Sequence, residues 1–224
     1  MVKLPDAFVN FKVVINNHLS IELLSMNDRI SENTLKSFRA FVNKFILTDD
    51  KLFDTLISNF EYKKVARKEL LLEASKTANK IFFLSEGFVR FYHTKNDGTE
   101  VTSDFYFAPG FITSFTSFID QKPSIVNIQA MVKMDVLFIK YKDLMALYDN
   151  EHKVERLGRL LAEQVFITSE KHLLSFLNDT PQDRYLWLMK EYPEYVKNIP
   201  LHYLASYLGI TAESLSRIRN RSVK

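Results

Sequence analysis

The chain has 224 residues, of which 46% are apolar and 25% charged, and a formal net charge of +3; these values are ordinary for a soluble globular protein and exclude a general polycation, so any binding of nucleic acid must be local. It contains no cysteine, which excludes disulfides, iron–sulfur clusters and zinc–thiolate sites. The longest apolar runs, such as Ile81 to Leu84, are far shorter than the ~20 residues of a membrane span, and no signal peptide is recognisable, so we expect a cytoplasmic protein.

The N-terminal part divides into an irregular stretch and two helices. Residues 1 to 25 carry apolar side chains without clean periodicity, as in a strand plus a helix or in a loosely attached arm. From Ser31 the apolar residues fall at helical spacing. A first helix carries Leu35, Phe38, Phe41, Val42 and Phe45, and a second one carries Leu52, Phe53, Leu56 and Ile57.

Short β-like segments follow after Phe60. The strongest local signal is Asn96-Asp97-Gly98 between Phe88–Thr94 and Thr99–Phe107, which predicts a β-hairpin. Several short strands separated by turn residues favour a small antiparallel roll or barrel. The other expected strands are Glu61–Arg67, Leu70–Leu72, Lys80–Ser85, Ile125–Met131 and Asp135–Tyr141.

Helical periodicity returns at Lys142 and predicts a long helix from Glu151 to Leu177. At 1.5 Å per residue this helix would be about 40 Å long, which is more than a small barrel can cover. We therefore expect a dimer seam, although the apolar repeat is imperfect and a helix packed along its own domain is the alternative. The predicted seam residues are Val154, Leu157, Leu161 and Val165.

Asn178-Asp179-Thr180-Pro181 marks a hinge, because Thr180 is a good helix cap and Pro181 a good first helical residue. The stretch Leu201–Asn220 then predicts two short helices that meet at a sharp turn. Gly209 can adopt the positive φ of that turn, and Thr211 can cap the second helix. Leu204, Ala205, Leu208, Ile210, Leu215 and Ile218 are the expected inward residues.

The outward face of the second helix is polar and basic. Residues 199–224 contain four basic residues against one acidic residue, an excess that favours contacts with phosphates. Arg217 could bind a guanine edge and Glu213 a cytosine amino group in the major groove of DNA. An ordinary helical hairpin with a solvated basic tail is the alternative.

No catalytic, metal or cofactor site is predicted. The chain lacks a phosphate-cradling glycine loop, a metal-binding His-Glu pair at helical spacing and a nucleophile flanked by glycines. Its five histidines are scattered without ligand spacing. We therefore expect neither an enzyme nor a cofactor-dependent protein.

The order of these elements resembles the bacterial Crp/Fnr family, that is, the cyclic-AMP receptor protein and the fumarate–nitrate regulator. The resemblance covers about residues 30 to 221 and is carried by IFFLSEGFVRFYHTKNDGTEV, FAPGFITSFTSFIDQKPSIVNIQAM and LASYLGITAESLSRIRNR. It implies an α+β fold with an eight-stranded, cyclic-nucleotide-binding-like β-roll (jelly roll), a long dimerisation helix and a winged helix-turn-helix. The implied divisions are an extension at 1–25, a sensor domain at 26–148, the long helix at 149–178 and a DNA-binding domain at 179–224; family members commonly start near a Met such as Met26.

The resemblance transfers residue by residue to the second helix of the turn. Glu213 and Arg217 match the base-contacting acid and arginine of the family, whereas Ala212 replaces the first arginine of that helix. The preferred DNA sequence should therefore differ from that of close relatives. The full set of expected DNA-binding residues is Thr211, Glu213, Ser214, Ser216, Arg217, Arg219, Asn220 and Arg221.

The segment that binds the ligand in the family, here residues 113–125, departs further from the family pattern. Cyclic-nucleotide binders carry Gly-Glu for the ribose and Arg-Ser or Arg-Thr for the phosphate, and those positions hold Thr113-Ser114 and Ser124-Ile125 here. A buried phosphate needs a cation with paired donors, so we expect no tight binding of cAMP or cGMP. The predicted degenerate pocket comprises Phe111, Thr113, Ser114, Phe115, Ser124 and Ile125.

The sequence thus predicts a homodimeric, sequence-specific DNA-binding transcription regulator for a near-palindromic duplex site. The resemblance also allows contacts with RNA polymerase and an unknown small-molecule effector. A small-molecule sensor whose C-terminal hairpin binds a protein partner is the alternative.

Overall fold

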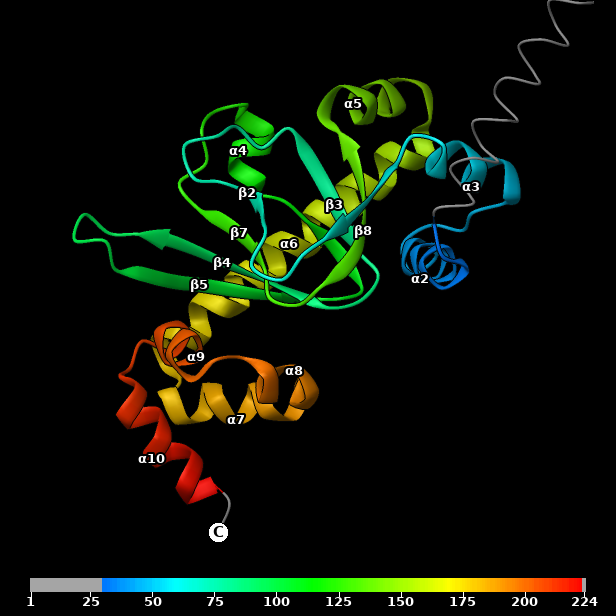
Figure 1. The fold of residues 1–224 in the computed structure, drawn as a ribbon. Coiled ribbons are helices and arrows are strands. Elements are labelled where there is room, and N and C mark those ends of the chain that lie inside the picture. The colour runs from blue at the N-terminus through cyan, green and yellow to red at the C-terminus, as the bar shows by residue number, and fades with distance from the viewer. Residues whose placement is uncertain (1–29, 223–224) are drawn as a thin grey trace, which may run out of the picture.

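The computed structural model describes residues 30–222 (Figure 1). The predicted extension at 1–25 and a start at Met26 lie outside the described residues. Within them, no helix is both long enough and apolar enough to cross a bilayer.

Along the chain, two helices precede the strands of a β-roll and further helices follow them. The N-terminal pair is α2 (Glu32–Val42) and α3 (Asp50–Ile57). The strands are β1 (Glu61–Val65), β2 (Leu70–Leu72), β3 (Lys80–Leu84), β4 (Phe88–Thr94), β5 (Glu100–Phe107), β6 (Gly110–Ile112), β7 (Asn127–Ala130) and β8 (Met134–Lys140), with α4 (Phe115–Asp120) after β6. Then follow α5 (Tyr141–Asn150), α6 (His152–Asn178), α7 (Pro181–Glu191), α8 (Pro193–Asn198), α9 (Leu201–Leu208) and α10 (Ala212–Ser222).

The strands form two four-stranded antiparallel sheets, in the orders β1-β8-β3-β6 and β2-β7-β4-β5. The predicted hairpin is confirmed as β4–β5, with Gly98 at φ 84° in its turn. The expected α+β fold, with a roll, a long helix and C-terminal helices, is therefore observed. Within residues 30–222 all strands lie between Glu61 and Lys140, so no wing strand accompanies the C-terminal helices.

The apolar core of the roll is continuous with the helices that cover it. Phe38 of α2 is fully buried, and its ring meets those of Phe60 and Phe83 edge-on at 5.0 Å. Val154 and Leu157 at the start of α6 belong to the same core. This packing fixes α6 along the roll over its first two turns.

The long helix has the predicted length, 27 residues, but its halves differ in environment. Val154 and Leu157 are only 2% and 4% exposed. Because both side chains are committed to the core of their own subunit, they have no surface to offer a partner, and the predicted seam must be corrected to begin at Leu161. Beyond that point apolar side chains are exposed on α6, namely Val165, Phe166, Ile167, Leu173, Leu174, Phe176 and Leu177.

The hinge after α6 forms as the sequence predicts. Thr180 and Asp183 make a reciprocal capping box and Pro181 is the first residue of α7. Arg184 then joins three helices, since its Nη1 donates to the Asp179 carbonyl after α6 (2.7 Å) and its Nη2 to the Leu208 carbonyl of α9 (2.9 Å). A guanidinium suits these positions, because helix C-termini carry unpaired carbonyls and partial negative charge.

The C-terminal helices dock on the roll through α9, which lies beside the β4–β5 hairpin (Figure 1). Phe88 and Phe105 of the sheet share a buried apolar cluster with Leu204 and Leu208 of α9. The backbone N–H of Thr102 in β5 also donates to the Ser206 hydroxyl at 3.0 Å. The strand that pairs with β4 therefore holds the first helix of the predicted turn.

A buried arginine completes this contact. Arg90 of β4 is 1% exposed, and its guanidinium carbon lies 3.9 Å from the ring centroid of Tyr92 and 3.6 Å from that of Tyr203 in α9. Its Nη2 donates to the Glu100 carboxylate at 2.6 Å and to the Gln129 side chain at 3.1 Å. Cation–π contact and a charge-assisted hydrogen bond together offset the burial of the charge.

His172 of α6 provides a pH-sensitive contact to the same sheet. Its Nδ1 lies 3.4 Å from the Asp104 carboxylate, and its ring lies beside that of Tyr207. The hydrogen bond to Asp104 raises the pKa of His172 above its ordinary value, against the opposing effects of burial and of the Arg184 charge.

We expect this contact to stabilise the fold more at low pH. Because the folded-state pKa of His172 is raised, its contribution is fully present below the unfolded value of about 6.5 and is lost as the pH rises through the folded value. The difference in free energy of unfolding between the native chain and His172→Gln, measured by urea denaturation, should therefore be larger at pH 6 than at pH 8. Taking the difference cancels the other histidines, and an equal or larger difference at pH 8 would contradict the assignment.

Candidate nucleic-acid interface and ligand pocket

The turn between α9 and α10 has the geometry that the sequence predicts. Gly209 adopts φ 71°, and the Ile210 N–H donates to the Ala205 carbonyl at 3.0 Å. Thr211 then caps α10, because its hydroxyl accepts from the Ser214 N–H at 3.2 Å. The two helices are thus set at an angle by a left-handed glycine and a hydroxyl cap.

The inner face of this pair is apolar. Leu204, Leu208 and Leu215 are fully buried and Ala205 is 2% exposed, so the small side chain lies at the crossing as expected. Ile210 and Ile218 pack against the same cluster while only partly buried. Leu215 is therefore the fully buried side chain by which α10 packs against α9.

The outer face of α10 is polar and open to solvent. Exposed side chains on or next to it are Thr211, Glu213, Ser216, Arg217, Asn220 and Arg221. In the described part of the chain, neither Arg217 nor Arg221 makes a salt bridge within 4.0 Å. In Figure 1, α10 extends away from the roll rather than against it. Two guanidinium groups are thus free to meet an external anion.

Two predicted contact residues are placed differently. Arg219 is partly buried, its guanidinium carbon lies 5.9 Å from the ring centroid of Tyr185 in α7, and its Nε has no hydrogen-bond partner. Ser214 is partly buried against the Thr211 hydroxyl at 3.2 Å. The helix period places both toward the protein, so Arg219 belongs to the packing and Ser214 to the cap.

Glu213 is the one acidic group in this region. The pKa of its carboxyl is lowered, first by a hydrogen bond from its own backbone N–H, then by the Thr211 hydroxyl and, more weakly, by the Arg217 charge. The free N–H groups of the first helical turn favour an anion there. Glu213 is consequently ionised at neutral pH and is available only as a hydrogen-bond acceptor.

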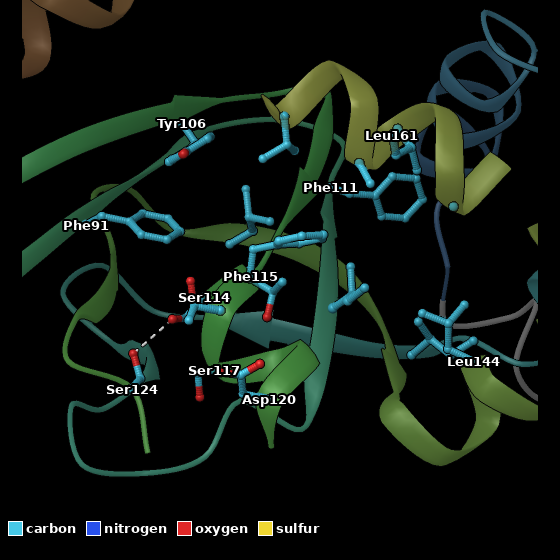
Figure 2. A pocket seen from close by; sticks show the side chains of 18 of the residues that line it. Phe91, Tyr106, Phe111, Ser114, Phe115, Ser117, Asp120, Ser124, Leu144 and Leu161 are labelled. Atoms are coloured by element: carbon cyan, nitrogen blue, oxygen red, sulfur yellow. Dashed lines mark hydrogen bonds between the residues drawn. The ribbon is translucent and has the colours of Figure 1, made fainter. Parts of the chain in front are cut away.

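All six residues of the predicted pocket line a single cavity of about 560 Å³ inside the roll. Figure 2 shows Phe111 and Phe115 with Phe91 and Tyr106 around this space, and Leu161 of α6 at its border. Phe111 belongs to β6 and Phe115 is the first residue of α4, and Thr113 and Ser114 lie between these two elements. The loop before β7 carries Ser124 and Ile125. Phe118 of α4 is 1% exposed and packs on Tyr141 in the core.

The polar groups of the cavity largely bind one another. The Ser114 and Ser124 hydroxyls, at the positions expected for the ribose-binding acid and the phosphate-binding arginine, are hydrogen-bonded at 3.0 Å (Figure 2). Ser124 also contacts the carbonyl and the N–H of Val126, and Thr113 donates to the Lys80 carbonyl. The only charged side chains among the lining residues are Asp120 and Lys122, both solvent-exposed.

The cavity also has a wall that sequence reasoning missed. It extends between α5 and α6, where its lining includes Leu144, Tyr148, Leu157, Gly158, Leu161, Ala162, Val165 and Ser169. At Gly158 a β-carbon would lie 2.2 Å from the Tyr148 hydroxyl, so the Tyr148 ring can occupy this position on α6 only above a glycine. No local pattern in the sequence distinguishes such residues from ordinary core positions. No group of three or more potential metal ligands occurs in residues 30–222.

Comparison with known proteins agrees with this architecture. Residues 62–151 match the family described as the cyclic nucleotide-binding domain. That segment contains seven complete strands (β2 to β8), all of β1 except Glu61, and α4 and α5. No curated protein matches the chain.

Solved structures of regulators share the fold at low sequence identity. FixK2 from Bradyrhizobium japonicum is 16% identical, with a TM-score of 0.63 over 72% of this chain and 83% of that chain. The c-di-GMP-responsive regulator CLP of Xanthomonas campestris is 15% identical, with a TM-score of 0.60 over 77% and 91%. A putative Crp/Fnr-family transcriptional regulator from Eubacterium rectale is 15% identical, with a TM-score of 0.61 over 79% and 84%.

The resemblance inferred from the sequence is therefore confirmed at the level of the fold. The likeness to FixK2 and to the Eubacterium rectale protein extends over 72% and 79% of this chain, and the cyclic nucleotide-binding family matches the roll itself. Residues 62–151 thus match the cyclic nucleotide-binding domain, and the chain shares its fold with solved structures that include a putative Crp/Fnr-family regulator.

Proposed function

We propose that the protein is a sequence-specific DNA-binding transcription regulator of the Crp/Fnr type. The observation that carries the proposal is the outer face of α10, where Arg217 and Arg221 are exposed and lack salt-bridge partners in the described residues. Packing of α9 and α10 in the protein does not by itself explain two exposed arginines without salt-bridge partners on α10. Binding to chromosomal DNA would also require the cytoplasmic location expected from the sequence.

The roles of the side chains follow from their places on α10. Arg217 and Glu213 lie one helical turn apart on the outward face, as needed to reach adjacent base pairs in the major groove. Arg221 and Ser216, together with the backbone at Thr211, would contact phosphates and fix the register. Arg219 is withdrawn from the predicted set because it turns toward Tyr185.

A second copy of the chain would supply the second recognition helix. The apolar surface from Leu161 to Leu177 supports this part of the proposal, since Phe166 is 70% and Leu173 59% exposed and large exposed apolar patches are rare on monomers. Phe166, Leu173 and Leu177 share one helical stripe. In a dimer of this kind, helix-turn-helix half-sites are about 34–36 Å apart.

The arginines of α10 should make distinguishable contributions to DNA affinity. We expect Arg217→Ala to weaken binding to the preferred duplex by ~1–3 kcal/mol and to relax sequence preference, whereas Arg221→Ala should weaken all duplexes alike. The measurement is fluorescence anisotropy with a duplex selected from a random pool and with a scrambled duplex of the same length.

The exposed Arg67 in the β1–β2 loop gives a matched control, and Arg67→Ala should bind as the native chain does. Affinity should also fall steeply with salt, because bound counterions are released. If the hairpin instead binds a protein, the native chain would show no salt-dependent affinity for any duplex.

The apolar stripe of α6 should determine the oligomeric state. Phe166→Glu combined with Leu173→Glu should raise the dimer dissociation constant at least about a hundredfold, because two charges would enter an apolar seam. Analytical ultracentrifugation measures this directly. Leu47→Glu changes a residue that is 83% exposed outside the helix and should leave the dimer intact; a native chain that sediments as a monomer would contradict the proposal.

We also propose that cAMP is not the effector. At the two decisive positions the cavity offers the hydrogen-bonded hydroxyls of Ser114 and Ser124 in place of an acid and an arginine, and loss of a buried charged partner costs ~2–5 kcal/mol. Isothermal titration of the full chain with cAMP should therefore give a dissociation constant weaker than about 10 µM, equivalent to ~7 kcal/mol. Tighter binding would refute this part of the proposal.

A further inference from the structure

We propose that the roll cavity binds an uncharged, mainly apolar small molecule. The ligand would reach from Ser114 and Ser124 at one end to Tyr148 and Gly158, between α5 and α6, at the other. The cavity, about 560 Å³, falls within the range of pockets that bury drug-sized ligands. Only the further step, that this ligand controls DNA binding, rests on the proposed function. The binding itself stands on the geometry of the cavity.

The walls of the cavity are aromatic and aliphatic over most of their extent. Phe91 of β4 and Phe111 of β6 face it from the sheets, Val126 lies in the loop before β7, and Leu161 and Val165 approach from α6. A ligand that removes this apolar surface from water is stabilised by roughly 25 cal/mol per Å² of area covered. A mostly polar ligand would leave much of this apolar surface in contact with water and would gain little from binding there.

The polar groups argue against a charged ligand. The two charged lining side chains, Asp120 and Lys122, have opposite signs and are both solvent-exposed, so neither offers a buried partner for a charged ligand group. The Ser124 hydroxyl is already bonded to Val126 and Ser114. An isolated carboxylate or phosphate carried into this space would lose its hydration without gaining a cation, which costs far more than a few hydroxyl contacts return.

One hydroxyl is available at the other end of the cavity. Tyr148 of α5 lines the cavity beside Gly158, and burial raises the pKa of its hydroxyl. Within residues 30–222 that hydroxyl makes no hydrogen bond to another protein group. A single carbonyl, ether or hydroxyl oxygen on the ligand would satisfy it, and the ligand class is accordingly an apolar ketone, ether or alcohol rather than a nucleotide.

The position of the cavity also suggests how an occupant would act. Its lining includes Leu161, Ala162 and Val165, which lie where the buried first part of α6 gives way to the exposed part. A ligand that packs on this segment would shift the same helix that carries His172 and ends at the Arg184 contact.

The probe that tests the proposal is N-phenyl-1-naphthylamine, an uncharged fluorescent aromatic amine, titrated into the full chain. We expect saturable binding of one molecule per chain with enhanced emission. Its sulfonated analogue, 8-anilinonaphthalene-1-sulfonate, has the same rings plus an anionic group and should bind at least tenfold more weakly. Equal or tighter binding of the sulfonate would overturn the claim that the site selects uncharged ligands.

Two matched variants locate the bound probe. Val126→Trp fills the cavity beside the loop that carries Ser124 and Ile125 and should weaken binding of the neutral probe at least tenfold. Leu47→Ala removes an exposed apolar side chain outside the cavity and should not change binding. If Val126→Trp does not fold, as judged by its thermal transition, Ala162→Trp fills the same space from α6. Unchanged affinity in a folded cavity-filling variant, or loss only in Leu47→Ala, would overturn the proposal.

The two proposals can fail separately. A chain that binds the neutral probe in the cavity but no DNA duplex refutes the regulator and leaves the ligand site standing. A chain that binds duplex but shows no saturable binding of the neutral probe refutes the ligand site alone.

Discussion

The arrangement of the protein depends on the contact between the β4–β5 hairpin and α9. Arg90 of β4 is paired with Glu100 of the neighbouring strand β5 and is buried between the rings of Tyr92 and Tyr203, so a charged group of the sheet is covered by an aromatic ring of α9. Loss of the Tyr203 ring would leave a poorly solvated guanidinium, which is costly. The position of α10 relative to the roll therefore follows from the position of β5.

This contact gives the cavity two physical connections to the C-terminal helices. One connection runs through Phe91 and Tyr106, which line the cavity and lie on the two strands of the docked hairpin. The other runs along α6 to the Arg184 side chain, which holds the ends of α6 and α9 together. An occupant of the cavity that moved either element would act on the same rigid pair of helices. Coupling of this kind requires only two arrangements of one interface and no continuous path of residues.

Much of this architecture could be predicted because it is encoded locally. The turn signal at Asn96-Asp97-Gly98, the cap and proline at Thr180-Pro181 and the left-handed Gly209 each act within a few residues, and each appears in the structure. Residues of the pocket were found through the family resemblance, and all six converge on one cavity.

The features that escaped prediction depend on tertiary contacts. An apolar stripe along α6 looks the same whether it meets its own roll or a partner, so Val154 and Leu157 were assigned to a seam although they are buried in the core. Arg219 looks like a phosphate contact until Tyr185 of α7 is placed beneath it. Arg90 gives no sign in the sequence that it will be buried between two tyrosines 111 residues apart.

The central claim is that the exposed face of α10 meets duplex DNA while α9 stays docked on the roll. Amide hydrogen exchange of the full chain, with and without a duplex selected from a random pool, tests it most directly. The account predicts that the duplex slows exchange in peptides spanning residues 209–221, while β4 and β5 exchange slowly in both states. A duplex that binds without protecting those C-terminal peptides, or that protects only another surface, would contradict it.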